Sequence, residues 1–332
     1  MRTRQAEVVS CGPRGLIRKD VTMHVAVFAD MEGSFGIWRK SQCRHGRPPW
    51  QYGRECLTAD VNRVIRGAFD GGADTVTVKD THDTGFNCIC KKLDPRASYN
   101  GGPYVKPTIF GSISGYDLIL YVAIHAASGT KDAFFPHTHF GEFSELRLNG
   151  KPIGEMELYG GCFGELGIPI GFVSGEDIAV QQALGAMPWL KTVSVEKKKE
   201  AYMAGKTSAA YLITGRKRLQ EQADAAVRNV SEMRSLVYQG PLHFEADFVS
   251  EAKAARYNTW GLERHGALIQ WESKTMLDGF DVINKLSWFP RNLYPVLPCM
   301  LFLFRRYYQI KNNYFPPRSN SEGAVNPGDN SC

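Results

Sequence analysis

The chain has 332 residues, of which 43% are hydrophobic and 22% are charged, proportions that are ordinary for a globular enzyme with room for two domains. The net charge is +6, but residues 1–22 carry +3 and residues 285–332 carry +4, which leaves −1 for the body, residues 23–284. The body therefore has no basic footprint for nucleic acid.

The first expected element is a short apolar run followed by two carboxylates. Residues 25–29 are typical of a buried strand, and Asp30 and Glu32 come directly after it. Two acids at a buried strand end would be dehydrated and would repel each other unless a positive charge lay between them. A divalent metal ion supplies that charge, because carboxylates can bridge two ions. For this segment alone, a turn with two solvated acids is the alternative.

The next elements repeat this pattern of a strand followed by polar residues. Apolar residues at helical spacing predict a helix over residues 54–70. Residues 75–78 and 118–123 predict two more strands, which lead to His82 and His125. A strand, a helix and a strand form a parallel crossover, and parallel sheets bind ligands beyond the carboxyl ends of their strands. A lone histidine is usually a hydrogen-bonded core or surface residue, but two at equivalent strand ends are expected to join the two acids.

A third kind of signal follows these strands. Asn149-Gly150 between two β-rich runs predicts a hairpin. The small-residue-rich segment 155–166 is typical of a helix. Glu155 at its start could be a metal ligand or could complement the helix dipole, and Glu157 could do the same. The residues alone do not separate the two glutamates.

The remainder of the chain predicts a second set of elements. We expect a long helix over residues 214–236, a strand near 242–249 and a final helix near 273–286. The apolar run 293–304 contains two prolines and is far shorter than the roughly 20 residues of a membrane span. We expect it to cover an apolar surface, to pack against a neighbouring subunit, or to be a non-native extension.

At this point the chain resembles the dizinc D-aminopeptidase family, the type encoded in bacterial dipeptide-transport operons. The resemblance covers about residues 23–286, and six pieces occur in the family's order with close to its spacing. They are Ala29-Asp-Met-Glu-Gly33, Lys79-Asp-Thr-His82, Ala123-Ile-His125-Ala-Ala-Ser128, Pro136-His137-Thr138, Asn149-Gly-Lys-Pro-Ile-Gly-Glu155, and Ile168-Pro-Ile170 with Val173-Ser-Gly-Glu-Asp177.

The resemblance implies a role for each matching residue. Two divalent metal ions per chain, taken to be zinc, would be bridged by Asp30. Glu32 and His82 would complete one site, and the other site would use His125 and Glu155, the last member of the ligand set. The resemblance further implies assembly into a homo-oligomeric ring and removal of N-terminal residues, often of D configuration, from short peptides.

The chemistry of the residues is compatible with that implication. A hydroxide that bridges two metal ions could attack a peptide carbonyl at neutral pH. The resemblance makes His137 the catalytic residue beside the metals, where it could stabilise the oxyanion or pass a proton to the leaving amine. Without the resemblance, His137 would be interpreted as a surface loop histidine. His139 is interpreted as a surface loop histidine even with the resemblance.

One segment departs from the family's pattern. Where the family commonly has another small residue and an asparagine after the Gly-Glu pair, this chain continues with Met156, Glu157, Leu158 and Tyr159. A charged and a bulky side chain there are expected to alter the pocket wall and with it the choice of substrate.

The fold class implied is α/β, with a largely parallel-sheet metal-binding domain, a smaller second α/β domain and the active site between them. We expect a basic extension over residues 1–22, the catalytic domain over 23–190, the second domain over 191–290, and an apolar segment with a disordered polar tail over 291–332. The eight dispersed cysteines and the lack of an apolar signal segment favour the cytoplasm.

Two competing functions remain open from the sequence. One is another dinuclear-metal hydrolase that acts on an amide or a phosphoester. The other is a non-catalytic peptide-binding protein of the same fold, against which the presence of all five proposed ligands and His137 argues.

Overall fold

The computed structural model describes residues 22–102, 115–197, 208–288 and 291–311. The predicted basic extension, apart from Thr22, and the predicted polar tail beyond Lys311 lie outside the described residues.

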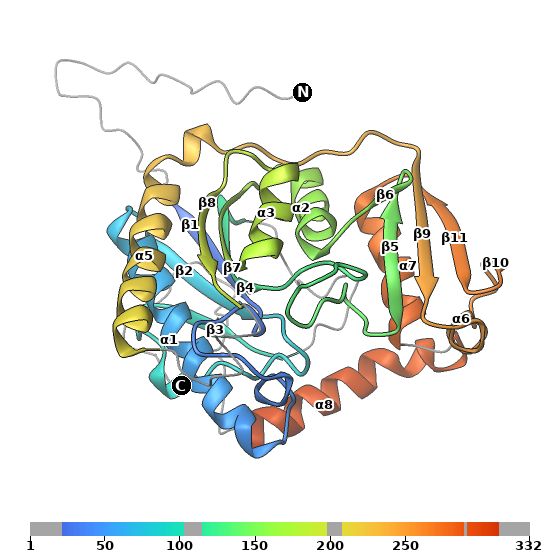
Figure 1. The fold of residues 1–332 in the computed structure, drawn as a ribbon, viewed down its shortest axis with the longest axis horizontal. Helices are drawn as coiled ribbons and strands as arrows, with labels where there is room; N and C mark the ends of the chain where they lie inside the picture. The colour runs from blue at the N-terminus through green and yellow to red at the C-terminus, as the bar shows by residue number, and fades with distance from the viewer. Residues whose placement is uncertain (1–21, 103–114, 198–207, 289–290, 312–332) are drawn as a thin grey trace, which may run out of the picture.

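The larger of two sheets is parallel throughout and has six strands in the order β3-β2-β1-β4-β7-β8 (Figure 1). Its strands are β1 His24–Ala29, β2 Thr75–Asp80, β3 Ser98–Asn100, β4 Leu118–Ile124, β7 Ile170–Glu176 and β8 Lys191–Val195. β1, β4 and β7 are buried along nearly their whole length, because helices cover both faces of the sheet. The predicted parallel crossover from β1 through a helix to β2 is therefore confirmed.

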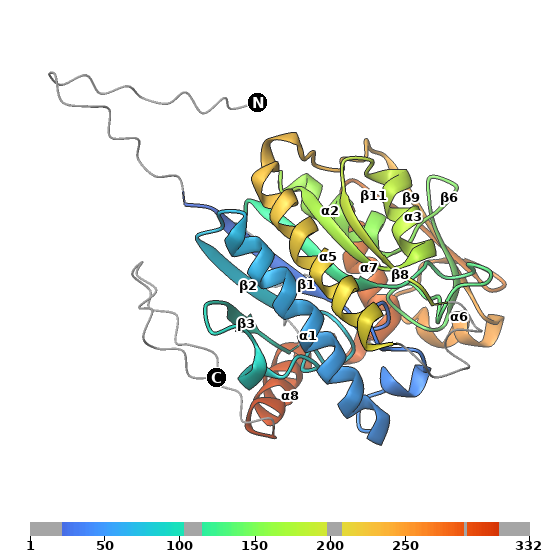
Figure 2. The same ribbon diagram turned by 60° about the vertical axis from the view of Figure 1, so that its left-hand side comes forward.

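Two pairs of helices cover the two faces of this sheet. α1 (Pro48–Asp70) and α5 (Ala209–Arg228) lie side by side on one face (Figure 2). α2 (Glu155–Glu165) and α3 (Asp177–Ala186) lie on the other. Each face has its own apolar core, and Phe28 of β1 packs against Tyr121 and Phe163 in the second of them.

The boundaries of two predicted helices were wrong. α1 begins at Pro48 and not at residue 54, because proline is favoured in the first helical turn and the buried Trp50 extends the apolar face. α5 runs from Ala209 to Arg228 and not over residues 214–236. The Ser208 side chain caps its start, and the side chain of Asn229 turns back to the Ala225 carbonyl at its end.

The smaller sheet has five antiparallel strands in the order β10-β11-β9-β5-β6. They are β5 Phe143–Leu148, β6 Lys151–Pro152, β9 Leu242–Phe248, β10 Glu263–His265 and β11 Leu268–Ser273. β5 and β6 form the predicted hairpin, in which Asn149 and Gly150 both have positive φ, as a type I′ turn requires. α6 (Glu251–Tyr257) and α7 (Met276–Trp288) pack on this sheet.

The two sheets draw strands from both sides of residue 190. β8 follows that position and joins the larger sheet, whereas β5 and β6 precede it and join the smaller one. The predicted division of the chain into domains at residue 190 stays a prediction, but the sheets themselves interleave along the sequence.

Short 3-10 turns and one further helix complete the described fold. Short 3-10 turns occur at η1 Lys40–Gln42, η2 Cys90–Lys92, η3 Val230–Glu232 and η4 Arg291–Val296. η4 leads into α8 (Leu297–Lys311), which runs along the lower edge of the molecule, from below the smaller sheet to beneath α1 (Figure 1). Within the described ranges, no helix combines the length and the apolarity needed to cross a bilayer.

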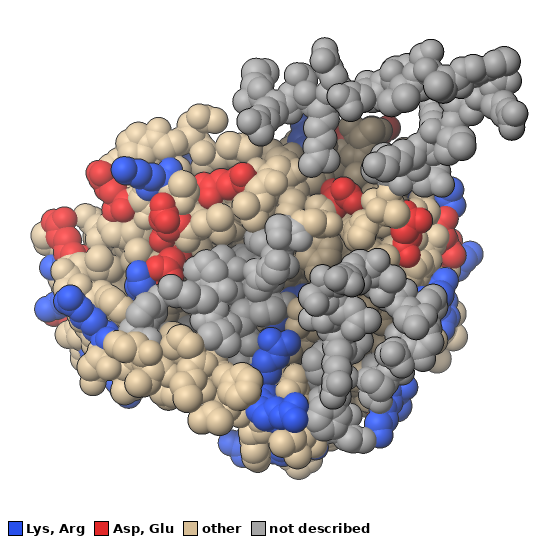
Figure 3. All heavy atoms as spheres, turned by 180° about the vertical axis from the view of Figure 1, so that it is seen from behind, with Lys and Arg blue, Asp and Glu red and all other residues tan. Residues whose placement is uncertain are grey.

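The surface carries charges of both signs. Acidic and basic side chains both occur across the described part of the rear face (Figure 3), in agreement with the small net charge of the body.

Candidate metal centre

The register of the larger sheet brings distant polar residues to one edge. Ala29, the last residue of β1, is paired with Asp80 on one side and Val122 on the other. Asp30 therefore lies just beyond that register, and the chain segments after β2 and β4 leave the sheet at the same edge. Parallel strands end at a common edge, which is why the prediction could be made from their order alone.

One group of three side chains forms at the ends of β1 and β2. The Nδ1 atom of His82 lies 3.1 Å from Asp30 Oδ1 and 3.1 Å from Glu32 Oε2. All three side chains are buried, and their ligand atoms lie within 4.8 Å of one another, as a shared ion requires.

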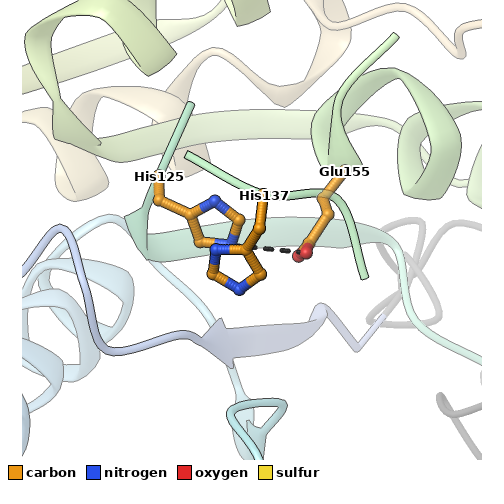
Figure 4. A group of neighbouring side chains, drawn as sticks. All are labelled: His125, His137 and Glu155. Atoms are coloured by element: carbon orange, nitrogen blue, oxygen red, sulfur yellow. Dashed lines mark ion pairs between the residues drawn. The ribbon is translucent and has the colours of Figure 1, made fainter. Parts of the chain in front are cut away.

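A second group forms beside the first. His125, at the end of β4, directs Nε2 to Glu155 Oε1 at 3.3 Å, and the ring of His137 stacks on the ring of His125 with centroids 3.7 Å apart (Figure 4). Nε2 of His125 also lies 3.3 Å from Asp30 Oδ2. The two oxygens of Asp30 thus face the two groups, one oxygen to each.

The hydrogen bonds of the histidines leave one ring nitrogen of each directed to the acids. Nε2–H of His82 donates to the Cys43 carbonyl at 2.7 Å, and Nδ1–H of His125 donates to the Ala126 carbonyl at 3.1 Å. A carbonyl only accepts, so the opposite nitrogen is the one that carries a lone pair when the ring is neutral. Metal-bound histidines characteristically hold their second nitrogen in this way.

The buried carboxylates of the candidate site favour positive charge beside them. Burial, with the charge of Glu32, raises the pKa of Asp30 to about 7. Burial opposes the charge of His125, yet Glu155 and Asp30 raise its pKa to about 10. The acids therefore favour the protonated forms of His125 and of His82, whose pKa is also raised, despite burial, by Glu32 and Asp30.

The donor set fits metal ions. Glu32 Oε2 is buried and, despite its approach to His82, accepts no hydrogen bond from a described group, which leaves a carboxylate oxygen unsatisfied. A cation at each group would satisfy that oxygen and would replace the protons. Three carboxylates and neutral imidazoles are ligands that zinc accepts.

Glu155 and Glu157 have separate roles. The carboxylate of Glu155 faces His125 and accepts a hydrogen bond from the His139 backbone at 2.7 Å. Glu157 turns back to the backbone N–H of Gly154 at 3.0 Å and so caps the helix. The structure therefore places Glu155, and not Glu157, at the candidate centre.

A backbone irregularity near the end of β4 lies beside the two groups. The pairing of β4 with β7 shifts between Tyr121 and Ile124, and Ala123 there has φ of 68°. Such irregularities re-aim side chains next to functional sites. Gly33 lies so close to this turn that a Cβ atom would come within 2.2 Å of the Ile124 carbonyl oxygen. Only glycine permits this approach, which keeps Glu32 near His125.

All six predicted site residues line one cavity of about 1220 Å³, between the edge of the larger sheet and α7. His139 and Tyr159 also line it, so of the two residues expected at the wall Tyr159 lies there, whereas Glu157 does not line the cavity. Within this site His137 lies in the loop after β4, where its backbone N–H donates to the Ala126 carbonyl.

Sequence reasoning missed other parts of the cavity. The backbone carbonyl of Cys43 orients His82, and no side-chain signal could reveal a carbonyl. Arg44 and Arg47, from the same loop, line the cavity, and so do Asn284 of α7 and residues of α8. Nothing in the local sequence of these segments points to a site.

Comparisons with known proteins match the chain to one family and one fold. The family model described as D-aminopeptidase matches residues 23–285. The D-aminopeptidase of Bacillus subtilis (strain 168) is 24% identical over 271 residues, which cover 79% of this chain and 95% of that protein. The solved structure of the Zn-dependent D-aminopeptidase DppA from Bacillus subtilis, a self-compartmentalizing protease, matches with a TM-score of 0.72 and 22% identity. That match covers 80% of this chain and 96% of the other, and it shows a shared fold.

Proposed function

The chain belongs to the D-aminopeptidase family, and on this premise we propose that it is a metal-dependent aminopeptidase that removes N-terminal residues from short peptides. The observation that carries the proposal is the position of Asp30. Its two carboxylate oxygens face two separate groups of candidate ligands inside one cavity. A shared carboxylate of this kind is typical of two-metal hydrolases.

We assign the ligands as the sequence predicted. Asp30 would bridge two zinc ions, Glu32 and His82 would hold the first, and His125 with Glu155 would hold the second. Zinc bound there would polarise the peptide carbonyl and supply a water that is reactive at neutral pH. Zinc is preferred because the solved relative is zinc-dependent and the donor set suits it.

His137 is assigned to proton transfer. Its Nδ1–H donates to the Phe135 carbonyl at 2.9 Å, so Nε2 carries the lone pair. Burial, and then the charge of His125, lower the pKa of His137 to about 4, which keeps the ring neutral. Nε2 would accept a proton from the attacking water and deliver it to the leaving amine. His137 could instead be a sixth metal ligand, because its ring stacks directly on that of His125. The metal content of a His137 variant separates the two roles.

The shape of the cavity favours an exopeptidase. The candidate ligands are almost fully buried, with Asp30 at 5% and Glu32 at 1% exposure, so access to them is restricted. A peptide would therefore reach them with one end first, and the family's activity makes that end the N-terminal one.

Assembly and location belong to the same proposal. We infer a homo-oligomer, by analogy with the self-compartmentalizing relative. A cytoplasmic location stays a prediction that rests on the dispersed cysteines.

One experiment tests the function directly. The purified protein is analysed for zinc, and hydrolysis of D-alanine amide and L-alanine amide is followed before and after chelation and zinc return. We expect about two zinc ions per chain, and turnover that disappears with the metal and returns with it. A zinc-loaded protein that cleaves neither amide nor any alanyl dipeptide would refute the proposed function.

A further inference from the structure

The cavity that holds the candidate metal centre has an apolar wall made by α8. Leu297, Met300, Leu301 and Phe304 of this helix line the cavity together with the six site residues. Leu297, Leu301 and Phe304 recur at intervals of four and three residues, which places them on one face of the helix. The family model ends at residue 285, so α8 is a part of this chain outside the family's common body.

Side-chain contacts hold α8 against that body. The ring of Tyr308 stacks on Phe86 with centroids 5.7 Å apart and meets the edge of His45 at 5.4 Å. Arg305 donates to the Asn100 side chain at 2.9 Å. His45 and Phe86 lie on the segments that follow β1 and β2, and Asn100 is the last residue of β3, so the contacts lie near the same sheet edge as the candidate metal centre. The helix is therefore docked where it can influence what reaches the metals.

The exposed fractions of the lining side chains differ between the two parts of the cavity. The metal-site side chains are buried, whereas Met300 and Phe304 are 47% and 38% exposed. α8 therefore lines the more exposed part of the cavity, and the candidate metal ligands line its more buried part. A peptide whose first residue reaches the metals would point the rest of its chain toward the more exposed part and so toward α8.

We propose that α8 forms a binding subsite for an apolar residue on the leaving-group side of the scissile bond. This inference rests on the proposed function and narrows its substrates to short peptides with an apolar residue after the first. Burial of that side chain against Leu301 and Phe304 would contribute in proportion to the apolar area removed from water. A charged side chain at the same position would lose hydration against this wall, because neither Leu301 nor Phe304 can pair with a charge.

The test uses the zinc-loaded full-length protein and four probes. D-Alanine amide or L-alanine amide, whichever is cleaved faster, reports on the metal centre alone, because it has no residue beyond the scissile bond. Alanyl-phenylalanine, alanyl-glycine and alanyl-aspartate of the same alanine configuration report on the subsite. The wild type is expected to prefer them in that order.

Variants on opposite faces of one helix separate the subsite from general effects. Leu301→Ala and Phe304→Ala should each lower kcat/KM for alanyl-phenylalanine about tenfold, the usual effect of trimming a hydrophobic pocket, and leave the amide within about twofold. Leu301→Arg should raise the rate for alanyl-aspartate relative to alanyl-phenylalanine. Phe302→Ala is the matched control, because Phe302 is 62% exposed and does not line the cavity.

A binding measurement checks the subsite without turnover. The affinity of alanyl-phenylalanine with a reduced, uncleavable peptide bond is measured by calorimetry, and it should fall in the Leu301 and Phe304 variants only. Equal rates and affinities for the phenylalanine and glycine probes in the wild type would overturn the inference while amide cleavage upheld the proposed function. An equal loss in Phe302→Ala would overturn it as well. No cleavage of any probe would overturn both proposals, and circular dichroism shows whether α8 still folds in each variant.

Discussion

Asp30 is the residue on which both candidate metal positions depend. It faces His82 with one oxygen and His125 with the other. We expect Asp30→Ala to lose both metal ions, because Asp30 faces both groups, whereas His125→Ala should lose mainly one, because His125 belongs to only one of them. Elemental analysis of the purified variants measures this. A full metal complement in the Asp30 variant would remove the bridging assignment.

His137 can be separated from the ligands by the same measurement. If it transfers protons, His137→Ala should keep its metals and its fold and lose about 10²–10⁴ in kcat, the usual range for such a group. If it is a ligand instead, the metal content should fall together with the activity. Near-normal turnover would leave His137 as an ordinary loop residue.

Lys197, which is not one of the candidate metal ligands, links pH to stability. Its ammonium group is buried and donates to the carbonyls of Ser34 and Ile37 at 2.6 and 2.5 Å. Burial lowers its pKa from 10.5 to about 8. Between pH 8 and 10.5 the unfolded chain therefore binds more protons than the folded one, and the contribution of Lys197 to the free energy of unfolding rises with pH, by about 3 kcal/mol at most.

Removal of the Lys197 ammonium group should remove this rise in the free energy of unfolding with pH. Urea unfolding of Lys197→Met at pH 8, 9 and 10 should show a flatter pH dependence than that of the wild type. Lys217→Met is the control, because its side chain is 75% exposed and should leave the dependence unchanged. Curves that run parallel for the wild type and the Lys197 variant would contradict the prediction.

At the scale of elements, the contact between α1 and α5 depends on a glycine. A Cβ atom on Gly67 of α1 would lie 2.2 Å from the backbone oxygen of Gln220 in α5. Gly67→Ala should therefore destabilise the protein by about 1–3 kcal/mol, the usual cost of overpacking, although alanine is the better helix former. Gly185 of α3 is the matched control, since nothing lies within 4 Å of its Cβ position.

The free energy of unfolding should thus fall in Gly67→Ala but not in Gly185→Ala. Gly185→Ala should be neutral or more stable than the wild type by up to about 1 kcal/mol. Chemical denaturation measures both changes. Equal stability of the two variants would mean that α5 shifts away from α1 at little cost.

At the scale of the whole molecule, α8 has an apolar outer face as well as an inner one. Leu303 and Ile310 are 60% and 61% exposed and lie seven residues apart, on one face of the helix. Exposed apolar surface of this kind promotes association. We expect Leu303→Ser with Ile310→Ser to lower the mass measured by light scattering, whereas Ile213→Ser, equally exposed on α5, should not. An unchanged mass would place any subunit interface elsewhere.

Much of the fold followed from local patterns in the sequence. The apolar runs predicted β1, β2 and β4, and Asn149-Gly150 predicted the hairpin, because strand burial and turn geometry are decided by neighbouring residues. The order of these elements then predicted a parallel sheet with Asp30, His82 and His125 at one edge. The starts and ends of α1 and α5 were less predictable, since tertiary contacts and caps decide them.

The sequence by itself thus determined which segments become strands and which polar residues follow them. Local residue patterns did not separate Glu155 from Glu157, because both begin the same helix. In the tertiary structure their partners differ, since Glu155 faces His125 and Glu157 accepts a hydrogen bond from the Gly154 backbone. The docking of α8 at the cavity was decided there as well. Its apolar residues are consistent with any buried surface, and contacts with distant side chains such as Phe86 and Asn100 select one. A local pattern specifies that a residue is buried, but the long-range packing of the chain specifies which residues bury it.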